Sequence, residues 1–215
     1  MTPFRKRVLF YVLTFLFLVF LFLTALVYVF PHSMPIDMEV SEEIQEYQHP
    51  YLDAFMKSIS AVGVFPYSVV MVLITALLFF VLRFRKEAIY ISATLLSGVV
   101  SSALKIIINR PRPTEDLVRI IGETKRQSFP SGHVLFYVLF FGFMLMLMYY
   151  LKSLPKTFRL IVAAISLFFI LTIPFSRVYL GAHWFTDVLG GFLFGLLCLL
   201  ILGFFYLQKP DKPSV

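Results

Sequence analysis

Three short clusters of ionisable and small polar residues stand beside long apolar stretches of this chain. They are Lys105 with Arg112-Pro113, then Pro130-Ser131-Gly132-His133, and finally Ser176-Arg177 with His183 and Asp187. Ionisable groups at membrane depth are energetically costly, so their presence there indicates a functional site. Three cations, two imidazoles and one carboxylate are groups that together would bind a phosphate and attack it.

The first cluster has the residue types that hold an anion. Lys105 lies near the end of an apolar stretch, and Arg112 follows where Pro111 and Pro113 must end a helix. The planar guanidinium of arginine matches phosphate oxygens, and lysine adds a compact charge. Taken alone, each residue could equally be an interfacial anchor whose side chain reaches the lipid headgroups.

The second cluster directly precedes another apolar stretch. Ser131 and Gly132 at a helix start leave backbone N–H groups available, where the helix dipole favours a phosphate oxygen. His133 would then lie in the first turn and face the same anion. For this cluster alone the sequence favours the simpler alternative, an N-cap serine followed by an interfacial histidine.

The third cluster has the spacing of a prepared imidazole. His183 and Asp187 are four residues apart and would lie on one face of a helix. A carboxylate that holds one ring nitrogen fixes the tautomer and leaves the lone pair of the other nitrogen pointing outward. Arg177 supplies another cation, whereas Asp187 alone could be an acid favoured by a helix N-terminus. The combination of all three clusters is what favours a phosphate site.

Composition places these clusters in an integral membrane protein. Sixty per cent of the 215 residues are apolar and only 14% are charged, unlike a soluble globular domain. Apolar stretches near the roughly 20 residues that cross a bilayer predict an all-α bundle of six transmembrane helices. We expect the spans at residues 8–30, 62–82, 88–108, 134–151, 158–175 and 186–207. The whole chain, 1–215, would form a single domain whose motif core covers about residues 105–187.

The segments between the spans predict an orientation. Residues 37–57 are acidic with apolar residues at helical spacing, which predicts an amphipathic interfacial helix, interpreted as a lid or resting surface for a substrate. Basic residues at the N-terminus, at 83–86, at 152–159 and in the C-terminal tail mark that side as cytoplasmic. The three clusters would then face the extracytoplasmic side of a plasma membrane. The basic loop 109–130 departs from this rule, and a catalytic demand for cations explains part of it. The net charge of +7 lies largely in short loops between spans, so no nucleic-acid partner is expected.

As a set, the clusters resemble the three signature motifs of the type 2 phosphatidic acid phosphatase (PAP2) superfamily at every defining position. The resemblance implies that His183 attacks phosphorus to give a phosphohistidine, that Asp187 orients it, and that His133 protonates the leaving oxygen. It also implies a set that holds the phosphoryl oxygens: Lys105, Arg112, Ser131, Gly132 and Arg177. Enzymes of this family typically need no metal, and the sequence offers no convincing metal-ligand set, so no cofactor is expected.

These expectations describe a membrane phosphatase acting on a lipid phosphate or pyrophosphate. The candidates are undecaprenyl pyrophosphate, slightly favoured, phosphatidylglycerol phosphate, phosphatidic acid and diacylglycerol pyrophosphate. Two alternatives stay open: a lipid-linked phosphotransferase that uses the same site, and an anion transporter, which the lack of paired broken-helix repeats disfavours. Bulky residues follow His133 at 134–137, where small ones are common in the family, so the sequence leaves the pocket shape undetermined. It also gives no indication of oligomeric state.

Overall fold

The computed structural model describes residues 3–121 and 127–208, and within these ranges every regular element is a helix. The helices are α1 (Pro3–Val29), α2 (Pro35–Gln45), α3 (Pro50–Ala61), α4 (Tyr67–Val81), α5 (Arg85–Ala93), α6 (Leu96–Ile108), α7 (Gly132–Tyr150), α8 (Lys156–Tyr179) and α9 (Phe185–Leu207). Counting α5 and α6 as one, five helices are long and apolar enough to cross a membrane. The remaining predicted span, 62–82, corresponds to α4, an apolar helix of 15 residues. The all-α membrane fold is therefore confirmed, with one span shorter than expected.

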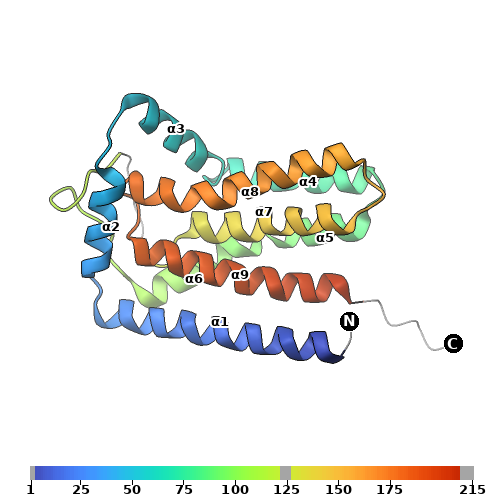
Figure 1. Ribbon diagram of the computed structural model, residues 1–215, viewed down its shortest axis with the longest axis horizontal. Coiled ribbons are helices and arrows are strands. Elements are labelled where there is room, and N and C mark those ends of the chain that lie inside the picture. Colours follow the sequence, from blue (N-terminus) through green and yellow to red (C-terminus); the bar gives the residue numbers. More distant parts are fainter. Residues whose placement is uncertain (1–2, 122–126, 209–215) are drawn as a thin grey trace.

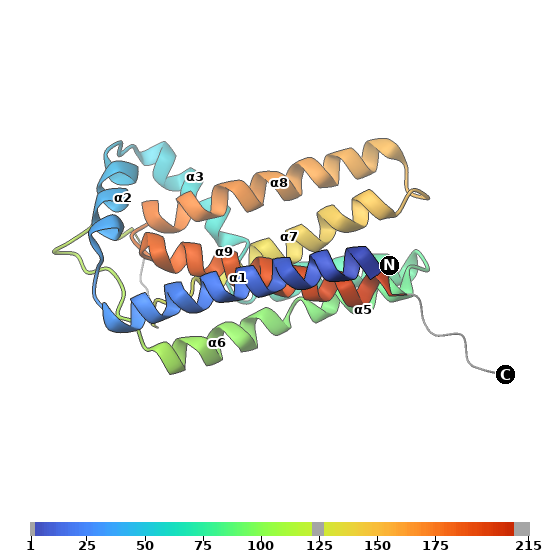
Figure 2. The ribbon, with the colours of Figure 1, turned by 60° about the horizontal axis from the view of Figure 1, so that its bottom comes forward.

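The long helices lie side by side along the longest axis of the molecule (Figure 1). The N-terminus, the α4–α5 and α7–α8 connections and the end of α9 lie at one end of the bundle. The ends of α6 and α8, the beginning of α9 and the whole of α2 lie at the other end (Figures 1 and 2). Because the first and third sequence clusters belong to those helix ends, the topology brings them to the same end of the bundle.

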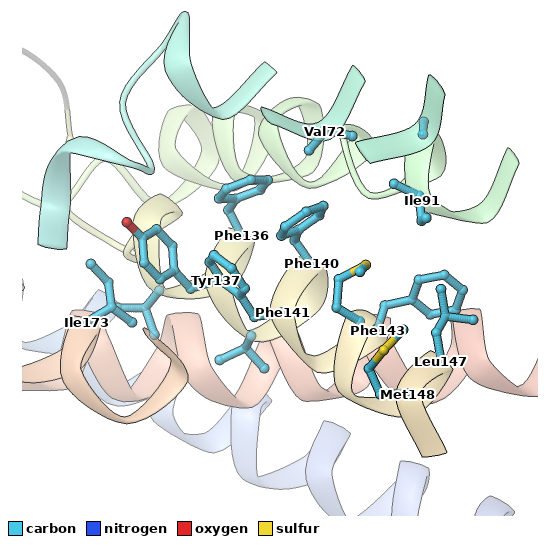
Figure 3. Close-up of a cluster of buried hydrophobic side chains, with 14 of the residues drawn as sticks. Val72, Ile91, Phe136, Tyr137, Phe140, Phe141, Phe143, Leu147, Met148 and Ile173 are labelled. Atoms are coloured by element: carbon cyan, nitrogen blue, oxygen red, sulfur yellow. The ribbon is translucent and has the colours of Figure 1, made fainter. Parts of the chain in front are cut away.

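The central helix of the bundle is α7. In its most apolar window 72% of the residues are buried, compared with no more than 33% in any other candidate span. Its side chains point in several directions: Phe136 lies near Val72 of α4, and Tyr137 lies near Ile173 of α8 (Figure 3). A helix that is apolar all round is typical of such a buried position. The central place of α7 explains why large side chains follow the second cluster.

α8 continues further than the sequence predicts. The sequence predicts a span that ends at residue 175, close to Pro174, and a loop that follows it, and a proline inside a helix removes one backbone hydrogen bond. The helix instead passes through Pro174 and ends at Tyr179, and its last turn bonds onward from the Leu180 N–H to the Ser176 carbonyl at 3.0 Å. Ser176 and Tyr179 are almost completely buried. Burial of this last turn outweighs the single lost hydrogen bond, so the third cluster begins on a helix and not in a loop.

The predicted span 88–108 is divided into α5 and α6 near Thr94. The Thr94 hydroxyl donates to the Ile91 carbonyl at 2.6 Å, and the Ser97 N–H bonds the Thr94 carbonyl at 3.1 Å. Threonine side chains that bond the backbone compete with the helical ladder, and bonds between residues three apart tighten the turn. This local competition accounts for the interruption.

The predicted interfacial segment 37–57 is helical, but it forms two helices in place of one. Pro50 disfavours a helical conformation at His49, and the His49 ring caps α3 by accepting from the Tyr51 N–H at 3.3 Å. α2 lies across the end of the bundle (Figure 1) and packs against α8 and α9. The Gln45 amide donates to the carbonyls of Arg119 and Tyr179, both at 2.9 Å. These bonds fasten α2 to the bundle and disfavour its interpretation as a lid.

We expect the close approach of α7 and α9 to tolerate no side chain at Gly191. A β-carbon there would lie 2.5 Å from the Ser131 carbonyl oxygen, whereas a β-carbon at Gly98 meets nothing within 4 Å. Gly191→Ala should lower the free energy of unfolding by about 1–3 kcal/mol through overpacking. Gly98→Ala should leave it unchanged or raise it by up to about 1 kcal/mol, because alanine is the better helix former. Thermal unfolding in detergent, followed by circular dichroism, measures both, and equal stabilities would contradict the close approach.

Candidate active site

The three sequence clusters meet where α6 and α8 end and where α7 and α9 begin. A cavity of about 270 Å³ is lined there by Lys105, Arg112, Gly132 and His133, which come from the first two clusters. The third cluster is joined to the second through the backbone, because the Ser131 N–H donates to the Asp187 carbonyl at 2.9 Å. Residues far apart in the sequence therefore form one site.

His183 lies between two sets of partners in the turn that precedes α9. Its side chain is 2% exposed, and its Nε2 lies 3.3 Å from Nη1 of Arg112. Its Nδ1 lies 3.3 Å from the Ser128 hydroxyl and 3.6 Å from Oδ2 of Asp187. With the proton on Nδ1, facing the carboxylate, Nε2 carries the lone pair and faces the cation. This is the arrangement that a nucleophilic imidazole requires.

Ser128 is a site residue that the sequence analysis missed. Its hydroxyl donates to Oδ2 of Asp187 and lies beside Nδ1 of His183, so it is placed between the two predicted partners. Ser128 lies in a long loop, where no regular spacing to other polar residues could have identified it from the sequence. The carbonyl of the same residue accepts from Nζ of Lys105 at 3.0 Å, so the loop that carries Ser128 is attached to α6.

Asp187 lies in the first turn of α9, and both oxygens of its carboxylate accept hydrogen bonds. Oδ2 accepts from the Trp184 N–H at 2.9 Å and from Ser128, and it is the oxygen nearest to His183. Oδ1 accepts from Nη1 of Arg110 at 2.6 Å. The carboxylate therefore caps the helix, as an N-terminal acid would, and the same carboxylate also lies beside the His183 ring. The two interpretations of Asp187 are compatible.

Arg110 is a second residue that the sequence analysis missed, since it was counted only among the basic residues of the loop 109–130. Its side chain is completely buried and ion-pairs with both Asp37 and Asp187. A buried and doubly paired arginine is an internal structural cation. It therefore accounts for part of the positive charge that opposed the predicted orientation, whereas Lys125 and Arg126 of that loop lie outside the described residues.

Lys105 and Arg112 are turned towards the site. Lys105 is only 9% exposed, and its Nζ donates to the carbonyls of Gln127 at 2.6 Å and Ser128 at 3.0 Å. Arg112 donates to the Ala182 carbonyl, directly before His183. Lys105 is buried and Arg112 is half-buried, and both donate to backbone carbonyls of the site, so the alternative of interfacial anchors does not describe them.

Ser131, His133 and Arg177 each keep a buried polar atom without a hydrogen-bond partner. In the described part of the chain four buried side-chain atoms have none, and three of these are Ser131 Oγ, His133 Nε2 and Arg177 Nε. Ser131 occupies the N-cap position of α7, but its hydroxyl makes no capping bond. Buried polar groups are normally satisfied. Their concentration in one region is typical of a site that receives the oxygens of a ligand.

The electrostatic environment of the site is positive. Burial lowers the pKa of His183 well below its ordinary value, and the nearby Arg112, Lys105, Arg177 and His133 lower it further. Cations that disfavour a charged imidazole are also the type of group that stabilises a bound phosphate. Among the described residues, no group of three or more His, Cys, Asp or Glu side chains is arranged to hold a metal ion.

The chain is similar to known membrane phosphatases. Residues 86–211 match the sequence profile of the PAP2 superfamily. Phosphatidylglycerophosphatase B from Bacillus subtilis (strain 168) is 32% identical over 193 residues, covering 85% of this chain and 88% of that protein. Lipid phosphate phosphatase delta from Arabidopsis thaliana is 29% identical over 166 residues, covering 73% of this chain and 39% of that protein.

Two solved structures share the fold. A transmembrane PAP2-type phosphatidylglycerolphosphate phosphatase from Bacillus subtilis gives a TM-score of 0.78 at 27% identity, covering 93% of this chain and 98% of that one. LpxE from Aquifex aeolicus gives a TM-score of 0.64 at 25% identity, covering 80% of this chain and 96% of that one. The likeness therefore extends beyond the three clusters to most of the helices.

We expect the His183 ring to be neutral at pH 6.5, because burial and the surrounding cations lower its pKa below the ordinary value of 6.5. The chain has four histidines, so ¹⁵N-histidine labelling gives a simple spectrum. The resonances lost in the His183→Asn protein identify the ring, and NMR in detergent micelles follows them with pH. A ring that is half-protonated at or above pH 6.5 would contradict this environment.

Proposed function

We propose that this chain, which belongs to the PAP2 superfamily and is a membrane lipid phosphatase, hydrolyses phosphatidylglycerol phosphate through a phosphohistidine intermediate. The observation that carries the proposal is the placement of His183, with Nδ1 facing Asp187 and Nε2 facing Arg112. The names of the Bacillus subtilis relative and of the Bacillus subtilis structure support the choice of substrate.

The first half of the reaction forms a nitrogen–phosphorus bond. The lone pair of His183 Nε2 attacks phosphorus while the bond from phosphorus to the lipid oxygen breaks. The electron pair of that bond goes to the leaving oxygen, which takes a proton from His133. The Asp187 carboxylate, whose Oδ2 lies 3.6 Å from Nδ1, stabilises the positive charge that develops on the ring, and the Ser128 hydroxyl lies 3.3 Å from the same nitrogen.

The second half of the reaction reverses these roles. His133, now neutral, takes a proton from a water molecule, which attacks phosphorus as the nitrogen–phosphorus bond breaks. Inorganic phosphate leaves and His183 recovers its lone pair. Lys105, Arg112 and Arg177 hold the three phosphoryl oxygens with the N-terminus of α7, and fixed charges of this kind are the main requirement of phosphoryl transfer.

The cavity next to the phosphate-binding residues is lined by serine hydroxyls and also by apolar side chains, among them Phe65, Val69, Leu95 and Phe136. It continues from Lys105 along α6, where it is lined by Ser97, Ser101 and Ser102, and it is bounded by Ser68 of α4. These hydroxyls suit the glycerol that lies beside the phosphate in phosphatidylglycerol phosphate. In undecaprenyl pyrophosphate an apolar chain is attached directly to the pyrophosphate, so we place phosphatidylglycerol phosphate first.

We place the reaction on the extracytoplasmic side of the plasma membrane. The bundle end opposite the site carries the N-terminus and the α4–α5 and α7–α8 connections (Figure 1). Those connections and the helix starts that follow them contain Arg83, Arg85, Lys86, Lys152, Lys156 and Arg159. An excess of lysine and arginine in short loops is typical of the cytoplasmic side, which supports this orientation.

We expect purified protein in EDTA to release phosphate fastest from phosphatidylglycerol phosphate. The comparison set is phosphatidic acid, diacylglycerol pyrophosphate and undecaprenyl pyrophosphate. His183→Asn should abolish release from every substrate, because no other group can form the intermediate. His49→Asn is the matched control: it replaces an exposed histidine by another N-capping residue and should keep wild-type rates. A preference for undecaprenyl pyrophosphate would overturn the substrate assignment, and activity in His183→Asn would overturn the mechanism.

We expect ³²P-labelled substrate to leave label on the peptide that contains His183 after a rapid alkaline quench. His133→Asn should slow turnover by roughly 10²–10⁴-fold, because proton transfer is lost in both halves of the reaction. Label that passes to an added lipid or sugar alcohol, and not to inorganic phosphate, would favour the phosphotransferase alternative. Label on any other residue would contradict the role of His183.

A further inference from the structure

Asp37, near the start of α2, is connected to the catalytic histidine through two buried ion pairs. Asp37 Oδ2 lies 2.7 Å from Nη2 of Arg110, and Nη1 of Arg110 lies 2.6 Å from Oδ1 of Asp187. The other oxygen of Asp187 faces Nδ1 of His183 at 3.6 Å. The side chains of Asp37, Arg110 and Asp187 are 0% exposed, so all three charges depend on one another.

Every N–H donor of Arg110 has an acceptor, which fixes the guanidinium in one orientation. Nη1 donates to Asp187 and to the Thr186 hydroxyl, Nη2 to Asp37 and to the His32 carbonyl, and Nε to the Pro31 carbonyl. The guanidinium therefore contacts only Oδ1 of Asp187. Oδ2 is left to Ser128, to the Trp184 N–H and to His183. Arg110, which binds Oδ1, acts together with the Trp184 N–H and Ser128, which bind Oδ2, to fix which oxygen faces the ring.

Asp37 also determines the net charge close to the His183 ring. A single pair of Arg110 and Asp187 would be close to neutral, and its field at His183 would be weak. Asp37 offsets the charge of Arg110, so the negative charge of Asp187 acts on the imidazole in a low-dielectric environment. Asp37 Oδ1 in addition accepts from the N–H and the hydroxyl of Thr186, both at 2.8 Å, which fixes the turn that carries Asp187.

We propose that Asp37 and Arg110 are positioning residues for Asp187, so that α2 forms part of the catalytic apparatus. Asp37 belongs to none of the three clusters and lies outside residues 86–211, which match the family profile. The inference rests on the proposed role of His183 as the nucleophile. The proposal gives α2, the first part of the acidic segment 37–57, a role in the chemistry. From the sequence alone, that segment is interpreted as a lid or resting surface for a substrate.

On the side away from Asp187, the His183 ring is surrounded by positive groups. The effect of the Asp37 charge can therefore be measured through the pKa of His183. The groups that act on His183 from the other elements are Arg112 of the loop after α6, Lys105 of α6, Arg177 of α8 and His133 of α7. All of them disfavour the imidazolium. Removal of the Asp37 charge should therefore lower the pKa of His183 further.

The test is Asp37→Asn, which removes the charge and keeps the shape. We expect kcat on phosphatidylglycerol phosphate to fall by roughly 10–100-fold, as is usual when a supporting hydrogen-bonded group behind a reactive one is changed. KM should stay within about threefold, because Asp37 contacts no phosphate-binding residue. The NMR titration midpoint of His183 should move down by roughly 0.5–1 unit. Asp37→Glu, which restores the charge, should recover most of that shift.

Glu87→Gln is the control for loss of a buried carboxylate. Glu87 is 9% exposed and accepts from the Tyr206 hydroxyl at 2.8 Å at the other end of the bundle. This variant should leave both kcat and the His183 titration unchanged. Equal behaviour of Asp37→Asn and Glu87→Gln, or a His183 midpoint that Asp37→Asn does not move, would overturn the proposal.

Arg110→Lys tests the orientation separately, because it keeps the charge and loses the planar fork. We expect kcat to fall by roughly tenfold or more without a shift of the His183 midpoint. Wild-type kcat in this variant would overturn the positioning role of Arg110, even if Asp37→Asn yields no folded protein. The result for His183→Asn separates this inference from the proposed function. Activity in His183→Asn would overturn the proposed function, whereas an inactive His183→Asn together with wild-type behaviour of Asp37→Asn and Arg110→Lys would overturn only this inference.

Discussion

The buried ion pair between Arg110 and Asp187 connects the two segments on which the site is built. Arg110 belongs to the loop that follows α6, and Asp187 belongs to the first turn of α9. Loss of one partner would leave an uncompensated charge among apolar helices, which typically costs about 3–5 kcal/mol. The loop that carries Arg112 and the turn that carries His183 therefore keep a fixed relation to each other.

The helices of the bundle form a rigid frame, and the segments at one end of it carry most of the residues to which we assign the chemistry. α7 is surrounded by other helices, so its first turn, with Ser131 and His133, has little freedom to move. The large residues that follow, Val134, Leu135 and Tyr137, are completely buried in the core. Their size serves the packing of α7, and of the four residues at 134–137 only Phe136 also lines the cavity.

Local patterns explain what the sequence could predict. Apolar length predicted most of the spans, and the spacing of His183 and Asp187 predicted that carboxylate and ring would be neighbours. Pro174 was misleading because tertiary burial of the following turn outweighed a lost backbone bond. Asp37 and Ser128 could not be found in this way, because their partners lie far away in the chain and no periodicity connects them.

The contacts of Arg110 also bear on how far the catalytic unit extends along the chain. Its carbonyl partners, Pro31 and His32, and its second carboxylate, Asp37, all precede the region that carries the family motifs. A chimaera that carried residues 86–211 on a foreign membrane anchor would contain every motif residue. It would nevertheless deprive Arg110 of three acceptors, so the motif-bearing half is not a transplantable module.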